Sequence, residues 1–296
     1  MHTKGQFPLE TSSRGGGRRQ PMPFTLEGRT ALVTGAARGI GRAIATRLAA
    51  AGAAVMINDL DEAAVSEAEC GLRTAGHTVA HICGDLTQPS FPDEMVKATL
   101  DTFGAIDIVV NNAGFTWDNV IQKTADEQFQ AMLDIHLVVP FRVLRAASGY
   151  IREAAKSEIA AGKRVMRKVV NITSIAGTQG NAGQAGYSSG KAGVIGLTRT
   201  LAKEWGRYNV NVNAVGFGLI DTRLTRPLDD SSNLEMHGHR IRIGVQPAML
   251  EAAKKASALG RMGSPEEAAG AVLFFCSPLS DYVTGEVLIC SGGFNF

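Results

Sequence analysis

Tyr187 and Lys191 stand four residues apart in the stretch GQAGYSSGKAGVIGLT, residues 183–198, where the neighbouring side chains are small. Residues at this spacing in a helix lie on one face, so the phenol and the ammonium group are expected side by side. A free tyrosine has a pKa of about 10, and a neighbouring cation lowers it. The pair therefore predicts a tyrosine that exchanges protons near neutral pH.

A serine precedes this pair at a suggestive place. Ser174 ends the expected strand KVVNITS, 13 residues before Tyr187. Ligands of open α/β sheets bind at the carboxyl ends of the strands, so the hydroxyl is expected beside the phenol. A Tyr–Lys pair alone occurs by chance in many helices. Together with the serine it predicts a catalytic group rather than a coincidental surface trio.

A glycine-rich turn lies earlier in the chain. The stretch TGAARGIG follows a short β-type run and places Gly35, Gly39 and Gly41 at the start of a helical pattern. Glycine at these positions allows phosphates to approach backbone N–H groups at a helix N-terminus. The spacing predicts a dinucleotide site, although glycine turns after strands are also found in purely structural roles.

Two aspartates follow the next expected strands. Asp59 lies 18 residues after Gly41, where an acidic residue bonds the ribose hydroxyls. A carboxylate there repels a 2′-phosphate and favours NAD, whereas Arg38 could pair with that phosphate, so NADP is not excluded. Asp59 could also be a helix N-cap. Asp85, in GDLT, could meet the adenine or cap a turn.

The elements that would position these residues alternate regularly. Short apolar strands separated by helical patterns predict an α/β fold, a Rossmann-type doubly wound parallel sheet of about seven strands with helices on both faces. No internal linker interrupts them, so residues 25–296 are expected to form one domain after a flexible extension, 1–24. The expected strands are TALVTG (30–35), AVMIND (54–59), TVAHICGD (78–85), IDIVVNNAG (106–114), KVVNITS (168–174), NVNVNAVG (209–216) and EVLICSGG (286–293).

Two stretches depart from this alternation. A basic stretch, 152–168, predicts a solvated helix end or, alternatively, a basic docking patch. A long segment without a recognisable motif, about 221–260, is expected to form a substrate lid. Its HxH pair, His237 and His239, has no third ligand nearby, so no metal site is predicted.

Composition excludes several classes of protein. The net charge is +2, of which residues 1–24 carry +3, so the remaining chain is close to neutral and gives no case for nucleic-acid binding. The four cysteines show neither CxxC pairs nor metal-ligand spacing. No apolar run is long enough to span a bilayer, and no secretory signal is present, so a cytoplasmic protein is expected.

Taken together, these motifs resemble the short-chain dehydrogenase/reductase family over roughly residues 26–296. The matching stretches are TGAARGIG, NNAG at 111–114, Ser174, YSSGK at 187–191 and the closing RMGSPEEAAGAVLFFCSPLSDYVTGEVLICSGG. The stretch from GNAGQAGYSSGK to LAKEW is most similar to the 3-oxoacyl-(acyl-carrier-protein) reductase branch, which acts in fatty acid metabolism.

The resemblance implies hydride transfer between a nicotinamide cofactor and a ketone or secondary alcohol. Tyr187 would exchange the proton, Ser174 would hold the substrate oxygen, and Lys191 would also bond the nicotinamide ribose. The resemblance further implies a homotetramer. Burial of the apolar residues Phe294 and Phe296 at a subunit contact would be consistent with it. The expected cofactor site comprises Gly35, Arg38, Gly39, Ile40, Gly41, Asp59, Leu60, Asp85, Leu86, Asn112, Ala113, Gly114, Tyr187, Lys191, Gly218, Ile220 and Thr222.

Two residues depart from the family pattern. His136 occupies the place of a catalytic asparagine that acts largely through its backbone carbonyl, and its larger ring is expected to disturb the helix. Phe217 replaces a proline before Gly218, which would loosen the turn or add a wall to the site. Alternative functions are therefore a dehydrogenase of a steroid, sugar or xenobiotic alcohol, or a weakly catalytic dinucleotide-binding sensor.

Overall fold

A parallel sheet of seven strands forms the centre of the molecule in the computed structural model, which describes residues 24–227, 233–236 and 238–294. The strand order is β3-β2-β1-β4-β5-β6-β9, so the chain proceeds outwards from β1 in one direction and from β4 in the other. The predicted doubly wound sheet is confirmed. The strands are β1 (Thr30–Thr34), β2 (Ala54–Asp59), β3 (Val79–Cys83), β4 (Ile108–Asn111), β5 (Arg167–Ser174), β6 (Val210–Phe217) and β9 (Val287–Cys290).

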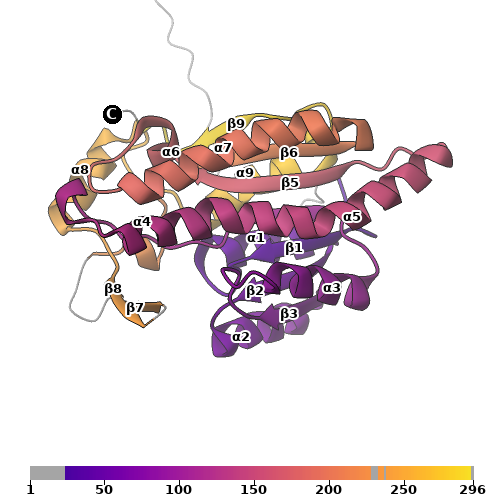
Figure 1. The fold of residues 1–296 in the computed structure, drawn as a ribbon, viewed down its shortest axis with the longest axis horizontal. Coiled ribbons are helices and arrows are strands. Elements are labelled where there is room, and N and C mark those ends of the chain that lie inside the picture. Colours follow the sequence, from indigo (N-terminus) through magenta and orange to yellow (C-terminus); the bar gives the residue numbers. More distant parts are fainter. Residues whose placement is uncertain (1–23, 228–232, 237, 295–296) are drawn as a thin grey trace, which may run out of the picture.

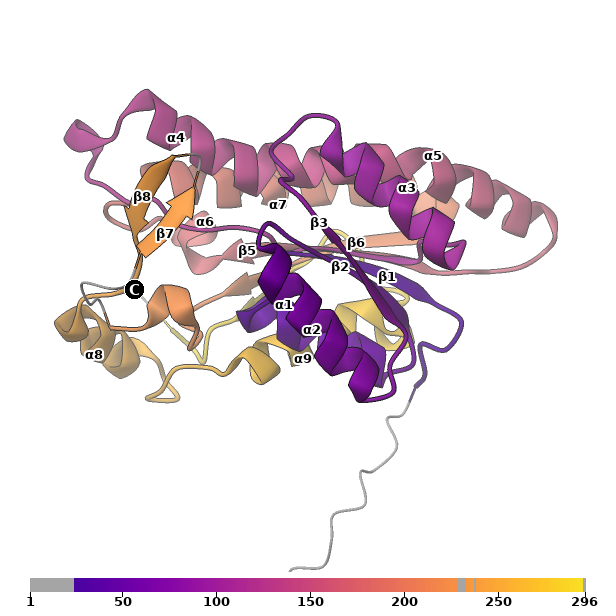
Figure 2. The ribbon, with the colours of Figure 1, turned by 90° about the horizontal axis from the view of Figure 1, so that it is seen from below.

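Helices cover both faces of this sheet (Figure 2). One layer consists of α1 (Gly39–Ala50), α2 (Glu62–Thr74) and α9 (Pro265–Cys276), and the other of α3 (Phe91–Phe103), α5 (Val139–Ala160) and α7 (Ala185–Trp205). Successive strand residues point to opposite faces, so Ala31 and Val33 join the core under the first layer and Leu32 joins the core under the second. Two apolar cores therefore hold the strand ends in a fixed position.

The helix expected through residues 125–150 consists of three parts. It comprises α4 (Asp126–Leu133), a π-helical turn (Asp134–Val138) and α5, which continues to Ala160. Single π-turns inside α-helices are frequent at functional sites, because the extra residue redirects one side chain. Here the turn contains His136.

The basic stretch 152–168 is only partly solvated. The end of α5 is exposed as expected, but Arg167 and Lys168 begin β5 and are buried. Arg167 donates two hydrogen bonds of 2.7 Å to Glu158, and Lys168 Nζ lies 2.7 Å from Asp281 Oδ1. The expectation of solvation was therefore wrong for these two residues, because acceptors distant in the sequence pair with their charges.

The segment before α9 contains structure that the sequence did not indicate. A 3-10 turn (Arg223–Thr225) leads to an antiparallel hairpin of β7 (Asn233–Met236) and β8 (His239–Arg242), followed by α8 (Pro247–Ala256). Figure 1 shows the hairpin and α8 at the same end of the molecule as α4 and α6 (Ile175–Gln179). Its role as a lid stays a prediction.

Parts of the sequence-based predictions lie outside the described residues. These are the extension, residues 1–23, together with Phe296, His237 and the side chain of His239. No helix of the described chain is long and apolar enough to cross a membrane.

Candidate active site

A cleft of about 1460 Å³ opens at the carboxyl ends of the strands. Every residue predicted for catalysis or cofactor binding lines it, from Gly35 in the glycine turn to Thr222 after β6. The residues chosen from the sequence therefore lie around one cleft, and their roles in it stay predictions.

The glycine turn is tightly packed against its surroundings. Gly35 and Gly39 have φ angles of +62° and +54°, which side chains rarely adopt. A Cβ on Gly41 would lie 2.0 Å from the carbonyl oxygen of Gly35. The side-chain amide of Asn112 donates to the carbonyls of Thr34 and Gly35, at 3.0 and 2.9 Å. The turn is thus fixed directly before the N-terminus of α1, and its backbone fits a pyrophosphate.

Asp59 lies at the end of β2 and holds the turn through its carboxylate. Its Oδ2 accepts a hydrogen bond from the Ala37 N–H at 3.0 Å, and its Oδ1 accepts one from Leu60 at 2.9 Å. The N-cap of α2 is Asp61, which accepts from the Ala64 N–H, so the alternative of Asp59 as the helix cap was wrong. These residues fit the adenosine half of a dinucleotide.

Arg38 is engaged in an exposed ion pair. Its guanidinium lies 2.8 Å from Asp61 Oδ2. A phosphate that approached Arg38 would therefore also meet the carboxylates of Asp59 and Asp61.

Asp85 closes a turn after β3. Its carboxylate accepts hydrogen bonds from the backbone N–H and the hydroxyl of Thr87, at 2.9 and 2.7 Å. The turn-capping role is therefore present, while Asp85 and Leu86 also line the cleft.

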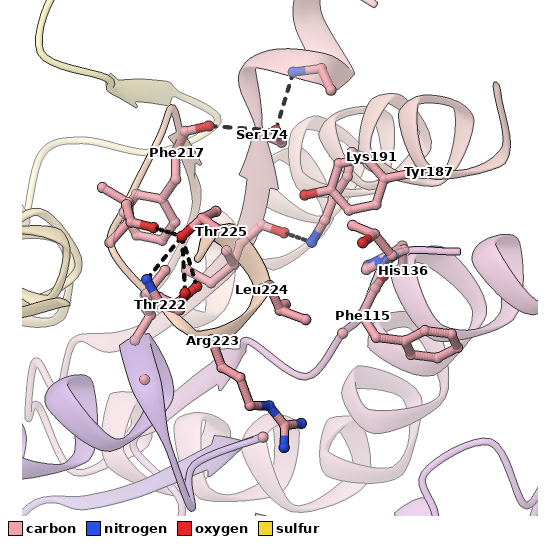
Figure 3. A pocket seen from close by; sticks show the side chains of 18 of the residues that line it. Phe115, His136, Ser174, Tyr187, Lys191, Phe217, Thr222, Arg223, Leu224 and Thr225 are labelled. Atoms are coloured by element: carbon pink, nitrogen blue, oxygen red, sulfur yellow. Dashed lines mark hydrogen bonds between the residues drawn. The ribbon is translucent and has the colours of Figure 1, made fainter. Parts of the chain in front are cut away.

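Ser174, Tyr187 and Lys191 meet at one point of the cleft wall (Figure 3). Ser174 ends β5 and caps α6, where its Oγ accepts from the Ala176 N–H at 3.2 Å and donates to the Phe217 carbonyl at 3.4 Å. Lys191 Nζ donates to the carbonyl of Ile172 at 2.8 Å. The end of β5 thus positions both the hydroxyl and the ammonium group, and α7 adds the phenol beside them.

Burial controls the ionisation of this group. It raises the pKa of Tyr187 to about 12, an effect that the nearby Ser174 hydroxyl counteracts and the charge of Asp118 reinforces. Burial also lowers the pKa of Lys191 to about 7. The sequence predicted a lowered tyrosine pKa. That prediction counted the charge of Lys191 together with that of a cationic nicotinamide; in the chain alone, desolvation disfavours both charged forms and raises the tyrosine pKa.

His136 is a buried, neutral imidazole next to Tyr187. Its Nε2 lies 2.7 Å from the carbonyl oxygen of Phe115, which can only accept, so we assign the proton to Nε2. Nδ1 is buried and has no hydrogen-bond partner among the described residues. Burial, together with the nearby charge of Lys191, holds the pKa of His136 well below its usual value. The ring meets the Tyr187 ring edge-on, with centroids 4.8 Å apart.

Two glycines make room for this ring. A Cβ on Gly114 would lie 2.5 Å from His136 Cε1, and one on Gly190 would lie 2.9 Å from His136 Cβ. The expected disturbance is confined to the π-helical turn, and the helix continues on both sides.

Phe217 turns its ring into the core rather than leaving the turn loose. Its side chain belongs to the apolar core shared with α1 and α9, although the residue also borders the cleft. The next residue, Gly218, donates its N–H to the Cys290 carbonyl at 3.1 Å and lies so close to Ser291 that a Cβ would clash. Strand β9 therefore holds this turn in place.

Sequence reasoning missed several residues of the cleft wall. Trp117, Asp118 and Gln184 line it, and Gln184 Nε2 donates to Asp118 Oδ2 at 2.6 Å. Their proximity to NNAG and Tyr187 in the sequence was an available signal.

Phe294 is 7% exposed and also lines the cleft, so it is already buried within its own chain rather than reserved for a subunit contact. In the described part of the chain no His, Cys, Asp and Glu side chains are grouped to hold a metal ion.

Comparisons with known proteins agree with this geometry. Residues 35–295 match the family model described as enoyl-(acyl carrier protein) reductase. The 3-oxoacyl-[acyl-carrier-protein] reductase FabG of Vibrio cholerae is 37% identical over 270 residues, which cover 91% of this chain and 98% of that relative. The chain belongs to the short-chain dehydrogenase/reductase family. As a member of it, the protein is an oxidoreductase that uses a nicotinamide dinucleotide.

Other members of the family differ in their named substrates. A (2S)-[(R)-hydroxy(phenyl)methyl]succinyl-CoA dehydrogenase subunit, BbsD of Thauera aromatica, is 35% identical over 268 residues, covering 90% of this chain and 97% of the relative. Among solved structures, a putative gluconate dehydrogenase of Agrobacterium tumefaciens has a TM-score of 0.77 and 34% identity, covering 92% of this chain and 97% of that one.

Proposed function

We propose that this protein reduces the ketone of a 3-oxoacyl thioester to the secondary alcohol with NADH. The observation that carries the proposal is the meeting of Ser174, Tyr187 and Lys191 on the wall of a cleft whose other half fits a dinucleotide. The proposal of a thioester substrate is supported by the relatives, which include 3-oxoacyl-[acyl-carrier-protein] reductases and a (2S)-[(R)-hydroxy(phenyl)methyl]succinyl-CoA dehydrogenase subunit.

The proton steps follow from the local contacts. The dinucleotide, when bound, supplies the hydride. Ser174 Oγ exchanges its long, 3.4 Å bond to the Phe217 carbonyl for a bond to the substrate oxygen. Tyr187 then donates its proton to that oxygen. A tyrosine pKa raised to about 12 keeps the hydroxyl protonated at neutral pH, which suits the direction of reduction.

Lys191 acts on this step through its charge. An ammonium group close to Tyr187 stabilises the phenolate that remains after proton donation. Its nitrogen lies 5.7 Å from the centre of the tyrosine ring. Lys191 would also bond the nicotinamide ribose, since it lines the cleft between the two halves.

NADH is the cofactor that the adenosine end favours. Asp59 offers carboxylate oxygens to ribose hydroxyls, and Arg38 is already paired with Asp61. A 2′-phosphate would face two carboxylates and one guanidinium. Repulsion by the two carboxylates outweighs the attraction of one flexible arginine side chain.

The first test is single-turnover oxidation of NADH and of NADPH by acetoacetyl-CoA, with Tyr187→Phe as the matched variant. We expect NADH to react well above NADPH, and the phenylalanine variant to bind NADH but lose at least about 100-fold in rate. A preference for NADPH would contradict the argument from Asp59 and leave the chemistry standing.

A second substrate distinguishes ketone from alkene reduction. The matching family model carries the name of an enoyl reductase, so crotonyl-CoA is assayed alongside. Reaction of crotonyl-CoA without acetoacetyl-CoA would overturn the ketone proposal. Reaction of neither, but of a steroid, sugar or xenobiotic ketone, would favour another branch, and NADH binding without any turnover would favour a sensor.

We also propose that the protein is a homotetramer. Support comes from apolar side chains that remain partly exposed on the outermost strand, Leu288 and Ile289 of β9, and on α9, where Phe274 is 37% exposed. Apolar surface on a sheet edge favours association.

A further inference from the structure

Two loops form the wall of the cleft beside Tyr187. Residues 115–119, which follow β4, and residues 181–184, which precede α7, pair through a hydrogen bond of 2.9 Å from the Asn119 N–H to the Gly183 carbonyl. Gln184 is the N-cap residue of α7, one turn before Tyr187, and its amide binds Asp118 at 2.6 Å. Asp118 is thereby held next to the N-terminus of α7, the helix that carries the phenol of Tyr187.

The Asp118 carboxylate has no cation to balance it among the described side chains. Its partner is the neutral amide of Gln184, and desolvation in the cleft raises its pKa. Its charge is close enough to Tyr187 to raise the pKa of that phenol. A group bound next to Tyr187 therefore meets a negative charge that the described part of the chain does not neutralise.

Apolar side chains make up part of the lining of the same cleft. They include Trp117, Leu224, Ile241, Val245, Met249 and Phe294. Arg223 also borders the cleft, but Figure 3 shows its side chain extending away from Ser174 and Tyr187. A second anion beside Tyr187 would be repelled by Asp118, and the described cation next to Tyr187, Lys191, already donates to the Ile172 carbonyl.

We propose that Asp118 selects the substrate, admitting ketones whose neighbouring acyl group is uncharged, such as a thioester, and rejecting free oxo acids. A hydrogen-bond donor on the substrate, such as an amide N–H, would bind Oδ1 of Asp118, because Oδ2 accepts from Gln184. This inference rests on the proposed ketone reduction and narrows its substrate class.

The test compares two probes that differ in charge beside the same ketone. These are acetoacetate and the acetoacetyl thioester of N-acetylcysteamine, which is neutral and carries an amide N–H. In the wild type we expect kcat/KM for the thioester to exceed that for acetoacetate by at least about 100-fold. Asp118→Asn, which keeps the shape and the contact with Gln184, should reduce this ratio by at least about tenfold. Asp126→Asn, which removes an exposed carboxylate of α4 outside the cleft, should leave it unchanged.

A second readout does not depend on substrate choice. The groups that face the Tyr187 ring or hydroxyl are Ser174, Lys191, His136 and the charge of Asp118. Removing the negative charge stabilises the phenolate, so the alkaline rise of alcohol oxidation should move to lower pH in Asp118→Asn.

The outcomes separate this inference from the proposed function. Turnover of the thioester with an unchanged ratio in Asp118→Asn overturns the selection by Asp118 and leaves ketone reduction standing. If neither probe reacts, the proposed function fails, and binding of acetoacetate to the NADH-loaded protein decides the inference. Asp118→Asn must then tighten acetoacetate binding at least about tenfold, and unchanged binding overturns it.

Discussion

At the scale of single residues, the site combines buried groups whose ionisation the fold opposes. Lys191 is 5% exposed, and its Nζ donates to the Ile172 carbonyl. His136 stays neutral between the Phe115 carbonyl and the Tyr187 ring. Such groups cost stability, and they persist where the reaction needs them.

Replacement of Lys191 by methionine should stabilise the fold and abolish activity. The pKa of the lysine is about 7 in the folded protein, against an ordinary value of 10.5, so between these pH values the unfolded chain binds more protons. The stability of the wild type therefore rises with pH in this window, and the penalty is complete below about pH 7. Replacing the lysine removes this penalty but leaves the Ile172 carbonyl without its ammonium partner, which costs about 1–3 kcal/mol. We therefore expect the free energy of unfolding to rise by about 1–3 kcal/mol at pH 7.

Urea denaturation of the two proteins at about pH 7 and about pH 10 provides the measurement. The advantage of the methionine variant should shrink as the pH rises. An advantage that grows with pH would show that the ammonium group stabilises the fold instead.

At the scale of elements, the glycine turn between β1 and α1 leaves no room for a Cβ atom at Gly41. A Cβ on Gly41 would lie 2.0 Å from the Gly35 carbonyl oxygen and 2.5 Å from the Asn112 amide nitrogen. Those two groups connect the turn to β4. Any residue larger than glycine must therefore displace the backbone that fits the pyrophosphate.

Gly41→Ala should weaken NADH binding by at least tenfold, about 1.4 kcal/mol. The matched control is Gly149→Ala on the exposed face of α5, where an added Cβ meets no atom within 4 Å. The control should bind NADH normally and gain about 0.5–1 kcal/mol of helix stability. Titration of NADH fluorescence measures both variants, and equal affinities would refute the assignment of the turn to the phosphates.

At the scale of the whole molecule, the outer edge of the sheet leaves apolar surface exposed. Leu288 and Ile289 of β9 are 38% and 42% exposed, and Tyr282 before this strand is fully exposed. Large apolar side chains in a row on an edge strand favour pairing with another chain. The cytoplasmic location and the role of residues 1–24 stay predictions.

The proposed tetramer has a mass of four chains of 31.2 kDa. Light scattering after size exclusion should give about four times the chain mass, and Ile289→Asp should reduce it, because a charge would be buried at the contact. A single-chain mass for the wild type would contradict the tetramer. An unchanged mass for Ile289→Asp would move the contact away from β9.

Local patterns determined much of this protein. Strand and helix periodicity gave the doubly wound sheet, since each element buries its own apolar face. The position of a residue at a strand end or on one helix face follows from spacing alone, and this placed Ser174, Tyr187 and Lys191 around one cleft.

Only the tertiary structure decided which charges are paired, buried or left unbalanced. Asp118 and Gln184 are 66 residues apart in the sequence, and Lys168 and Asp281 are 113 apart. Tyr187 has a raised pKa because desolvation depends on everything packed around it, not on its neighbour in the helix. Sequence spacing determines on which face of one helix or strand a side chain lies. Contacts between distant elements, and the exclusion of water between them, exist only once the chain has folded.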